Sequence, residues 1–135
     1  MGLTGYVTCF PFGGIMGKDI CIIDDNQEYL EASSQLLQEN GYKVTTINDP
    51  HYALQFLQHN KPHLIILDLM MPNMDGFTLL RQIKDDIHLR NIPVLIVSGK
   101  VFLPEKKRAA SMGAVDFLTK PVKGKDLLSK ITEYC

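Results

Sequence analysis

The chain has 135 residues, which is the length of a single domain. Fourteen Lys plus Arg against fifteen Asp plus Glu leave a net charge of -1, which argues against a strongly basic nucleic-acid-binding domain and against a polybasic membrane-binding domain. No apolar run approaches the ~20 residues of a membrane span. The three cysteines lack metal-ligand spacing and indicate free thiols, so we expect a reducing, cytoplasmic location.

The first 17 residues differ from the remainder of the chain. They contain five of the ten glycines and no charged side chain. A secretory signal would need a basic start and an unbroken apolar core, and this stretch has neither. We interpret residues 1–17 as an extension, either poorly ordered or left over from cloning, and we place the folded domain at residues 18–135.

The predicted elements begin with an apolar strand at residues 19–23, followed by a helix over 26–40 and a β-rich strand at 42–47. A second helix opens with Pro50 at its first position and ends before Pro62. The elements that follow are a strand at 63–67, the breaker-rich turn MMPNMDG, a helix carrying Phe77, Leu80, Ile83 and Ile87, a strand at 92–97, a helix at 103–112, a strand at 114–118 and a helix at 123–134.

This alternation of five strands with five helices predicts an α/β fold. Strands that are apolar throughout are buried on both faces, which indicates a parallel sheet between two helix layers. Right-handed crossovers then give a doubly wound open sheet. In such sheets, ligands bind outside the carboxyl ends of the strands.

Polar side chains follow four of the five predicted strands at that edge. Asp24 and Asp25 end the first strand, Asp68 ends the third, Ser98 ends the fourth, and Lys120 comes just after the fifth. All of these strands would end at the same edge of the sheet. The fold therefore predicts a shallow cleft that holds three carboxylates, one hydroxyl and one ammonium group.

The predicted cleft has a clear chemical preference. Three neighbouring carboxylates raise one another's pKa unless a cation neutralises them. Hard oxygen ligands suit Mg²⁺, and the lack of a His or Cys cluster argues against Zn²⁺. Lys120 is able to bind a phosphoryl oxygen, and Ser98 is able to donate a hydrogen bond to another. Asp68 lies centrally and is the candidate nucleophile that would form an acyl phosphate.

In this pattern the chain resembles the receiver domain of two-component response regulators. The resemblance rests on the acidic pair, on LIILDLMMPNMDG, on the Ser after IPVLIV and on AVDFLTKP. Ser98 follows Asp68 by 30 residues and Lys120 follows Ser98 by 22, as in chemotaxis-type receivers. The resemblance covers residues 18–135 and implies a (βα)5 flavodoxin-like fold with strand order 2-1-3-4-5.

The resemblance also assigns the chemical roles. Asp68 would be the phosphoacceptor. Asp25, Asp68 and the backbone carbonyl of Met70 would bind Mg²⁺ directly, and Asp24 would act mostly through water. Lys120 would pair with the Asp68 carboxylate and then with the phosphoryl group.

Two further groups of residues take roles from the resemblance. Ser98 and Phe117 match the switch pair, in which the hydroxyl turns to the phosphoryl group and the aromatic ring turns inward behind it. Met70 and Lys100 lie two residues beyond Asp68 and Ser98, where they flank the path of the attacking water. Together with Gly99, which leaves space beside the phosphate, they would tune the lifetime of the phosphorylated state.

The implied function is phosphorelay signalling, so the chain would be a signalling domain that catalyses only its own phosphorylation and dephosphorylation. The donor would be a phosphohistidine on a histidine kinase or phosphotransfer domain. The switched surface, residues 102–134, would bind a downstream protein or a second copy of the chain. We expect no direct nucleic-acid partner and no membrane partner.

Two other functions use similar parts. A haloacid-dehalogenase-like phosphohydrolase has the same residue types, but it carries its nucleophile in an Asp-x-Asp pair after the first strand, and Asp68-Leu69-Met70 lacks the second acid. A flavodoxin-like cofactor module needs a Gly/Ser/Thr-rich loop after the first strand, where this chain has Asp-Asp-Asn-Gln-Glu. The sequence leaves open whether the domain stands alone or belongs to a hybrid kinase or longer regulator.

Overall fold

The computed structural model describes residues 17–72, 74–99 and 102–135. Its main sheet has five parallel strands in the order β2-β1-β3-β6-β7. The strands are β1 (Asp19–Ile23), β2 (Lys43–Ile47), β3 (Leu64–Leu67), β6 (Val94–Ser98) and β7 (Asp116–Thr119). This arrangement confirms the predicted doubly wound sheet and its order 2-1-3-4-5.

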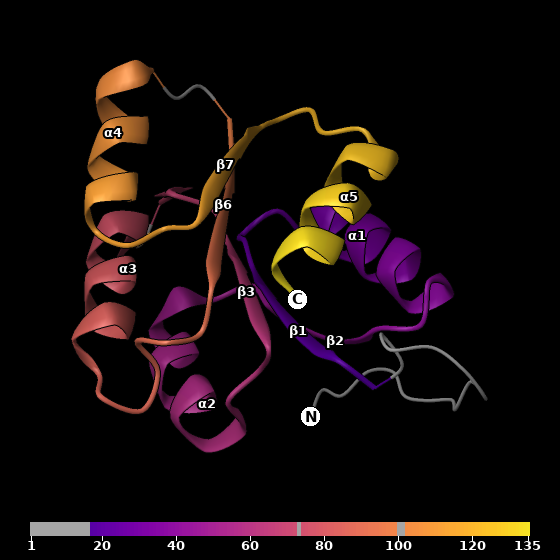
Figure 1. The fold of residues 1–135 in the computed structure, drawn as a ribbon, viewed down its shortest axis with the longest axis horizontal. Helices are drawn as coiled ribbons and strands as arrows, with labels where there is room; N and C mark the ends of the chain where they lie inside the picture. Colours follow the sequence, from indigo (N-terminus) through magenta and orange to yellow (C-terminus); the bar gives the residue numbers. More distant parts are fainter. Residues whose placement is uncertain (1–16, 73, 100–101) are drawn as a thin grey trace.

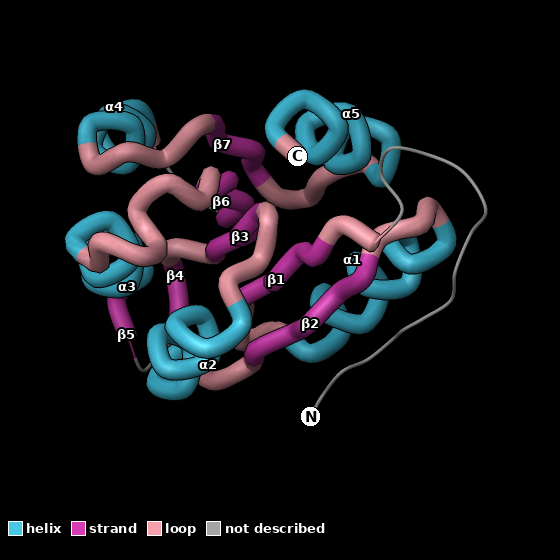
Figure 2. Tube along the Cα trace, turned by 60° about the horizontal axis from the view of Figure 1, so that its bottom comes forward, coloured by secondary structure: helices cyan, strands magenta, loops and turns pink. Residues whose placement is uncertain are grey.

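Five α-helices cover the two faces of the sheet. They are α1 (Gln27–Glu39), α2 (Ala53–Asn60), α3 (Gly76–Asp85), α4 (Leu103–Ser111) and α5 (Gly124–Tyr134). Figure 1 shows α1 and α5 together on one side of the sheet and α2, α3 and α4 on the other. The view in Figure 2 shows the same two layers with the sheet between them.

Apolar side chains alternate between the two faces of the central strands. Cys21, Ile23 and Ile65 pack into the cluster beneath α2 and α3, whereas Ile22 and Ile66 pack into the cluster beneath α1 and α5. All of these side chains are at most 1% exposed. Burial on both faces explains why the strand sequences show no polar alternation.

Some element boundaries differ from the prediction. A 3-10 turn, η1 (Pro50–Tyr52), precedes α2, because the Asp49 side chain caps the backbone N–H of His51 before the α-helix begins. Helix α3 ends at Asp85, so Ile87 lies beyond it and is 65% exposed. The prediction that Ile87 belongs to the apolar face of that helix is therefore wrong.

The turn after β3 also contains regular structure. Two short strands, β4 (Met70–Met71) and β5 (Met74–Asp75), pair antiparallel and lead into α3. Gly76, the first residue of α3, lies against the backbone after Asp68, and a Cβ there would come 2.4 Å from Leu69 Cα. Only glycine allows this approach, which holds the end of β3 next to the start of α3.

The two described cysteines agree with the prediction of free thiols. Cys21 and Cys135 are free, and burial raises the pKa of the Cys21 thiol to about 12, which makes it unreactive. Within the described ranges, no helix has the length and apolar character that a membrane crossing requires. The predicted extension falls almost wholly on residues 1–16, outside the described residues.

Candidate functional site

Backbone hydrogen bonds fix the residues that follow the strands at the carboxyl edge of the sheet. The Asp24 N–H donates to Ile47 O, and the Asp68 N–H donates to Ile23 O at 3.0 Å. At the other side of the site, the Lys120 N–H donates to Ser98 O at 2.8 Å. The sheet therefore brings together the predicted acids, hydroxyl and lysine, which lie up to 96 positions apart in sequence.

Lys120 lies between two buried carboxylates. Its Nζ is 2.5 Å from Asp24 Oδ2 and 3.4 Å from Asp68 Oδ2. Asp24 is 1% exposed and Asp68 is 5% exposed. The ion pair with Asp24 is thus the closer of the two, whereas the resemblance pairs Lys120 with Asp68. A carboxylate as deeply buried as Asp24 needs a counter-charge, and Lys120 supplies it.

The other oxygen of Asp68 is also occupied. Ser98 Oγ donates to Asp68 Oδ1 at 2.5 Å, and the backbone N–H of Met70 donates to the same oxygen at 3.0 Å. Ser98 is completely buried. These donors hold the Asp68 carboxylate in one orientation at the end of β3.

The charges of this cluster act on one another. Burial raises the pKa of Asp24, and the charge of Asp68 adds to that increase, while the hydrogen bonds from Lys120 and from the Asn26 N–H oppose it. Burial lowers the pKa of Lys120, but the hydrogen bond to Asp24 and the two carboxylate charges outweigh it, so the pKa is raised. Lys120 is therefore a permanent cation in the site.

Three carboxylates are close enough to share a metal ion. Asp24, Asp25 and Asp68 each offer an oxygen, and these oxygens lie within 4.8 Å of one another. Asp25 is exposed, which leaves one side of the group open to water and to a phosphoryl donor. Hard oxygen ligands and an open side fit Mg²⁺, which keeps part of its water shell.

Tyr29 belongs to the site but was missed in the sequence analysis. The Lys120 Nζ lies 4.3 Å from the centroid of the Tyr29 ring. Burial raises the pKa of the phenol, which therefore stays neutral. The available signal was its position, four residues after Asp25 in the first turn of the helix that begins just beyond the acidic pair.

The structure describes the predicted switch pair and two of the three predicted lifetime residues. Phe117 is half-buried and packs against the core beneath α2 and α3, with Lys106 Nζ 5.3 Å from its ring centroid. Gly99 has open space, since a Cβ there would meet no atom within 4 Å. The Met70 side chain is 56% exposed, and Lys100 lies outside the described residues.

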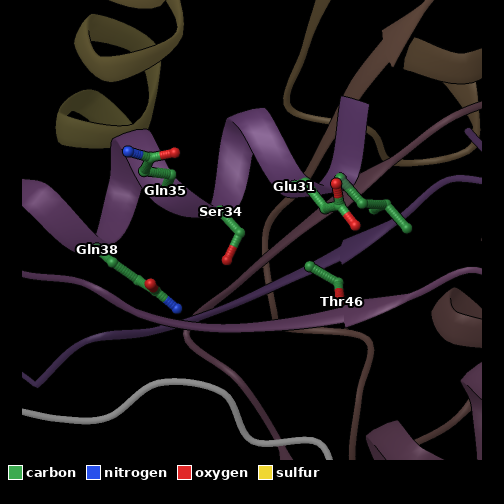
Figure 3. A pocket seen from close by; sticks show the side chains of 6 residues that line it. Glu31, Ser34, Gln35, Gln38 and Thr46 are labelled. Carbon is green, nitrogen blue, oxygen red and sulfur yellow. The ribbon is translucent and has the colours of Figure 1, made fainter. Parts of the chain in front are cut away.

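The acidic cluster is separate from a surface hollow of roughly 400 Å³ between α1 and β2. Figure 3 shows Ser34 and Gln38 on the side of α1 that faces Thr46 of β2. The other lining residues are Leu30, Glu31 and Gln35. The lining contains a carboxylate and no cation, so no positive charge favours a phosphoryl group there.

Comparison with known proteins gives one consistent family. Residues 20–132 match the response regulator receiver domain. Protein RcaC of Microchaete diplosiphon is 37% identical over 112 residues, which are 83% of this chain and 17% of that protein. Two-component response regulator ORR3 of Oryza sativa is 36% identical over 109 residues, or 80% of this chain and 83% of ORR3.

Solved structures agree with the sequence relatives. A CheY-like receiver domain protein from Methanospirillum hungatei has a TM-score of 0.82 at 28% identity, covering 87% of this chain and 92% of that one. The signal receiver domain of a histidine kinase from Syntrophus aciditrophicus has a TM-score of 0.79 at 34% identity, covering 87% and 89%.

The relatives differ greatly in size. The chain spans 17% of RcaC and 26% of the response regulator PleD of Caulobacter vibrioides, but 83% of ORR3. What these proteins share with this chain is one signalling domain of two-component systems, whose family role is phosphorylation-based signal transduction. This assignment also decides against the phosphohydrolase alternative. The chain belongs to the response regulator receiver domain family.

Proposed function

We propose that this chain receives a phosphoryl group on Asp68 from a phosphohistidine of a histidine kinase or phosphotransfer domain in the cytoplasm. The observation that carries the proposal is the set of groups around one carboxylate. Ser98 and the Met70 N–H hold Asp68 Oδ1, and the Lys120 ammonium lies 3.4 Å from Oδ2. Such a fixed carboxylate beside a cation suits nucleophilic attack on a phosphoryl group.

The transfer itself exchanges one bond for another. An Asp68 oxygen forms a bond to phosphorus while the bond from phosphorus to the donor nitrogen breaks. The electron pair of that bond stays on the imidazole, and the product on this chain is an acyl phosphate. Catalysis then consists mainly of positioning and electrostatic stabilisation, because the reacting groups need little other help.

The residues around Asp68 would respond to the new charge. Lys120 is close enough to move from its two carboxylates to a phosphoryl oxygen, and the Ser98 hydroxyl exchanges its bond to Asp68 Oδ1 for a bond to phosphate. Asp24, Asp25 and Asp68, with the Met70 carbonyl, would hold Mg²⁺. When bound, Mg²⁺ supplies positive charge for the transferring phosphoryl oxygens.

We infer that the response reaches residues 102–134 through Ser98 and Phe117. Ser98 ends β6 and pairs with Thr119 of β7, and Phe117 lies two residues earlier on β7, where it pairs with Ile96. A shift of the hydroxyl leaves space that the ring can take, which changes the surface formed by α4, β7 and α5. That surface would bind a downstream protein or a second copy of the chain. Hydrolysis resets it, at a rate set by Met70, Gly99 and Lys100.

The test is intact mass spectrometry after incubation with acetyl phosphate, with and without Mg²⁺. Wild type should gain the mass of one phosphoryl group only when Mg²⁺ is present, and Asp68→Asn should gain none. An equal gain by folded Asp68→Asn would overturn the assignment of the phosphoacceptor. Failure of the wild type with acetyl phosphate, followed by failure with a phosphorylated histidine donor protein, would overturn the proposed function.

A further inference from the structure

The ammonium group of Lys120 has a third neighbour besides the two carboxylates, which is the face of an aromatic ring. Tyr29 lies on the first turns of α1, and its ring centroid is 4.3 Å from Lys120 Nζ. A cation at this distance from a ring face is attracted by the negative potential above the ring. The ring also covers an ammonium that the carboxylates have already partly buried.

The position of the Tyr29 ring is tied to the acidic loop. The Asn26 N–H donates to Asp24 Oδ1 at 2.9 Å, and Asn26 Oδ1 accepts from the Tyr29 N–H at 3.1 Å. Asn26 therefore links the carboxylate that holds Lys120 to the start of the helix that carries the ring. The Tyr29 ring and the Asp24 carboxylate, which both contact the Lys120 ammonium, therefore belong to one segment that these hydrogen bonds hold together.

The hydroxyl group of Tyr29 takes no part in this contact. It is buried, and none of the described residues gives it a well-formed hydrogen bond, although Ser33 lies near enough to oppose the increase in the pKa of the phenol. The nearby Ser33 hydroxyl donates its own hydrogen bond to the backbone oxygen of Tyr29 at 2.6 Å. What Tyr29 offers to the site is therefore the face of its ring.

We propose that Tyr29 is a positioning residue for Lys120, and that its ring face keeps the ammonium between Asp24 and Asp68 and within reach of an incoming phosphoryl group. This inference rests on the proposed function, since it concerns the lysine that acts in phosphoryl transfer. Lys120 Nζ lies 2.5 Å from Asp24 and 3.4 Å from Asp68, so the attraction of Asp24, if nothing opposed it, would draw the ammonium away from Asp68. The ring limits that movement because leaving its face exchanges a cation–π contact for water.

The first experiment compares variants that keep or remove the ring face. With acetyl phosphate and Mg²⁺, Tyr29→Leu should be phosphorylated about five-fold more slowly than wild type, which is the effect of one partly buried cation–π contact. Tyr29→Phe keeps the face and should recover most of the rate. Tyr29→Met serves as a second non-aromatic variant if Tyr29→Leu does not fold, and Tyr52→Leu, on an exposed tyrosine of η1, is the matched control.

A double-variant cycle separates positioning from a general structural role. If Tyr29 acts through Lys120, then Tyr29→Leu should not slow phosphorylation further in a Lys120→Ala background. An equal five-fold loss in that background would overturn the proposal. A Tyr29→Phe variant as slow as Tyr29→Leu would overturn it too, because the hydroxyl would then carry the effect.

A second readout does not depend on phosphorylation. In NMR spectra of the unphosphorylated protein, the methylene protons next to Lys120 Nζ should be displaced upfield by the ring in wild type and in Tyr29→Phe. They should move to the ordinary lysine position in Tyr29→Leu, and unchanged shifts there would contradict the proposal. If wild type accepts no phosphate from any donor while these shifts behave as expected, the proposed function fails and the placement of Lys120 by Tyr29 stands.

Discussion

At the scale of single residues, the site depends on one lysine that serves several partners. Lys120 neutralises Asp24, contacts Asp68 and lies over the Tyr29 ring. Burial of Asp24 and the charge of Asp68 both raise the pKa of Asp24, so the site carries unfavourable electrostatic energy that the lysine only partly offsets. Such a cluster is ready to accept a further cation or to exchange its contacts when a phosphoryl group arrives.

The first prediction concerns that lysine. Lys120→Ala should still accept phosphate on Asp68, more slowly than wild type, but it should transmit little of the change to residues 102–134. The reason is that the variant loses the ammonium that contacts Asp24 and Asp68 and would move to the phosphoryl group, whereas its backbone N–H can still donate to Ser98 O. Amide NMR shifts over residues 102–134, recorded before and after phosphorylation, would measure the transmission. Changes as large as those of wild type would contradict the prediction.

At the scale of elements, the turn between β3 and α3 shows how closely the backbone must pack beside Asp68. A Cβ on Gly76 would lie 2.4 Å from Leu69 Cα and 2.6 Å from Asp68 O. Backbone atoms cannot yield as a flexible side chain can. The start of α3 would therefore have to move away from the end of β3, together with the residues that orient Asp68.

We accordingly expect Gly76→Ala to lower the free energy of unfolding by about 2–3 kcal/mol, as is typical of overpacked sites. Urea denaturation would measure this loss. Gly99→Ala is the matched control for stability, since its Cβ would meet no atom within 4 Å, and its effect should stay within about 0.5 kcal/mol. Equal stability of the two variants would contradict the packing argument.

A second element-scale contact joins β7 to α5. Asp116 accepts hydrogen bonds from Lys130 Nζ at 2.6 Å, from Tyr134 Oη at 3.0 Å and from the Phe117 N–H at 2.8 Å. Burial acts to raise the pKa of Asp116, but these three donors outweigh it and hold the pKa below its usual range. The contact therefore ties the last helix to the strand that carries Phe117.

The pH dependence of this contact follows from the sign of the shift. Because the pKa of Asp116 is lowered on folding, its contribution is complete above the unfolded pKa of about 3.9 and is lost as the pH falls through the folded value. Asp116→Asn should cost about 1 kcal/mol of unfolding free energy at pH 7. Urea denaturation of both proteins should show that difference shrinking below about pH 4. A difference that persists at pH 2 would show that the charge is not responsible.

At the scale of the whole molecule, binding of a metal ion at the sheet edge should stabilise the fold. A ligand that binds only the folded state adds free energy by mass action, about 1.4 kcal/mol at ten times its dissociation constant. We expect Mg²⁺ to raise the unfolding temperature of wild type. Asp25→Asn should reduce this response, because the exposed Asp25 is one of the three carboxylates in the group. Equal responses in thermal unfolding would argue against Asp25 as a ligand.

Most of the site could be predicted from the sequence because its residues follow the ends of regular, parallel strands. Asp24, Asp68 and Ser98 each stand where an apolar strand ends, so the parallel topology alone places them at one edge. Tyr29 has no such marker, because an aromatic residue on an amphipathic helix resembles any core residue. The closer contact of Lys120 with Asp24 than with Asp68 could not be predicted from the sequence either, since it depends on how deeply each carboxylate is buried.

The sequence by itself determined the number of main strands, the two helix layers and the residues that meet at the sheet edge, because strand burial and helix amphipathicity leave local patterns along the chain. The order of the strands in the sheet came from the resemblance to receiver domains. The tertiary structure alone decided the hairpin of β4 and β5, the exposed position of Ile87 beyond α3, the closer pairing of Lys120 with Asp24 and the contact with Tyr29. The two Lys120 contacts depend on distances between residues far apart in sequence. Burial and electrostatics set such distances only after the chain has folded.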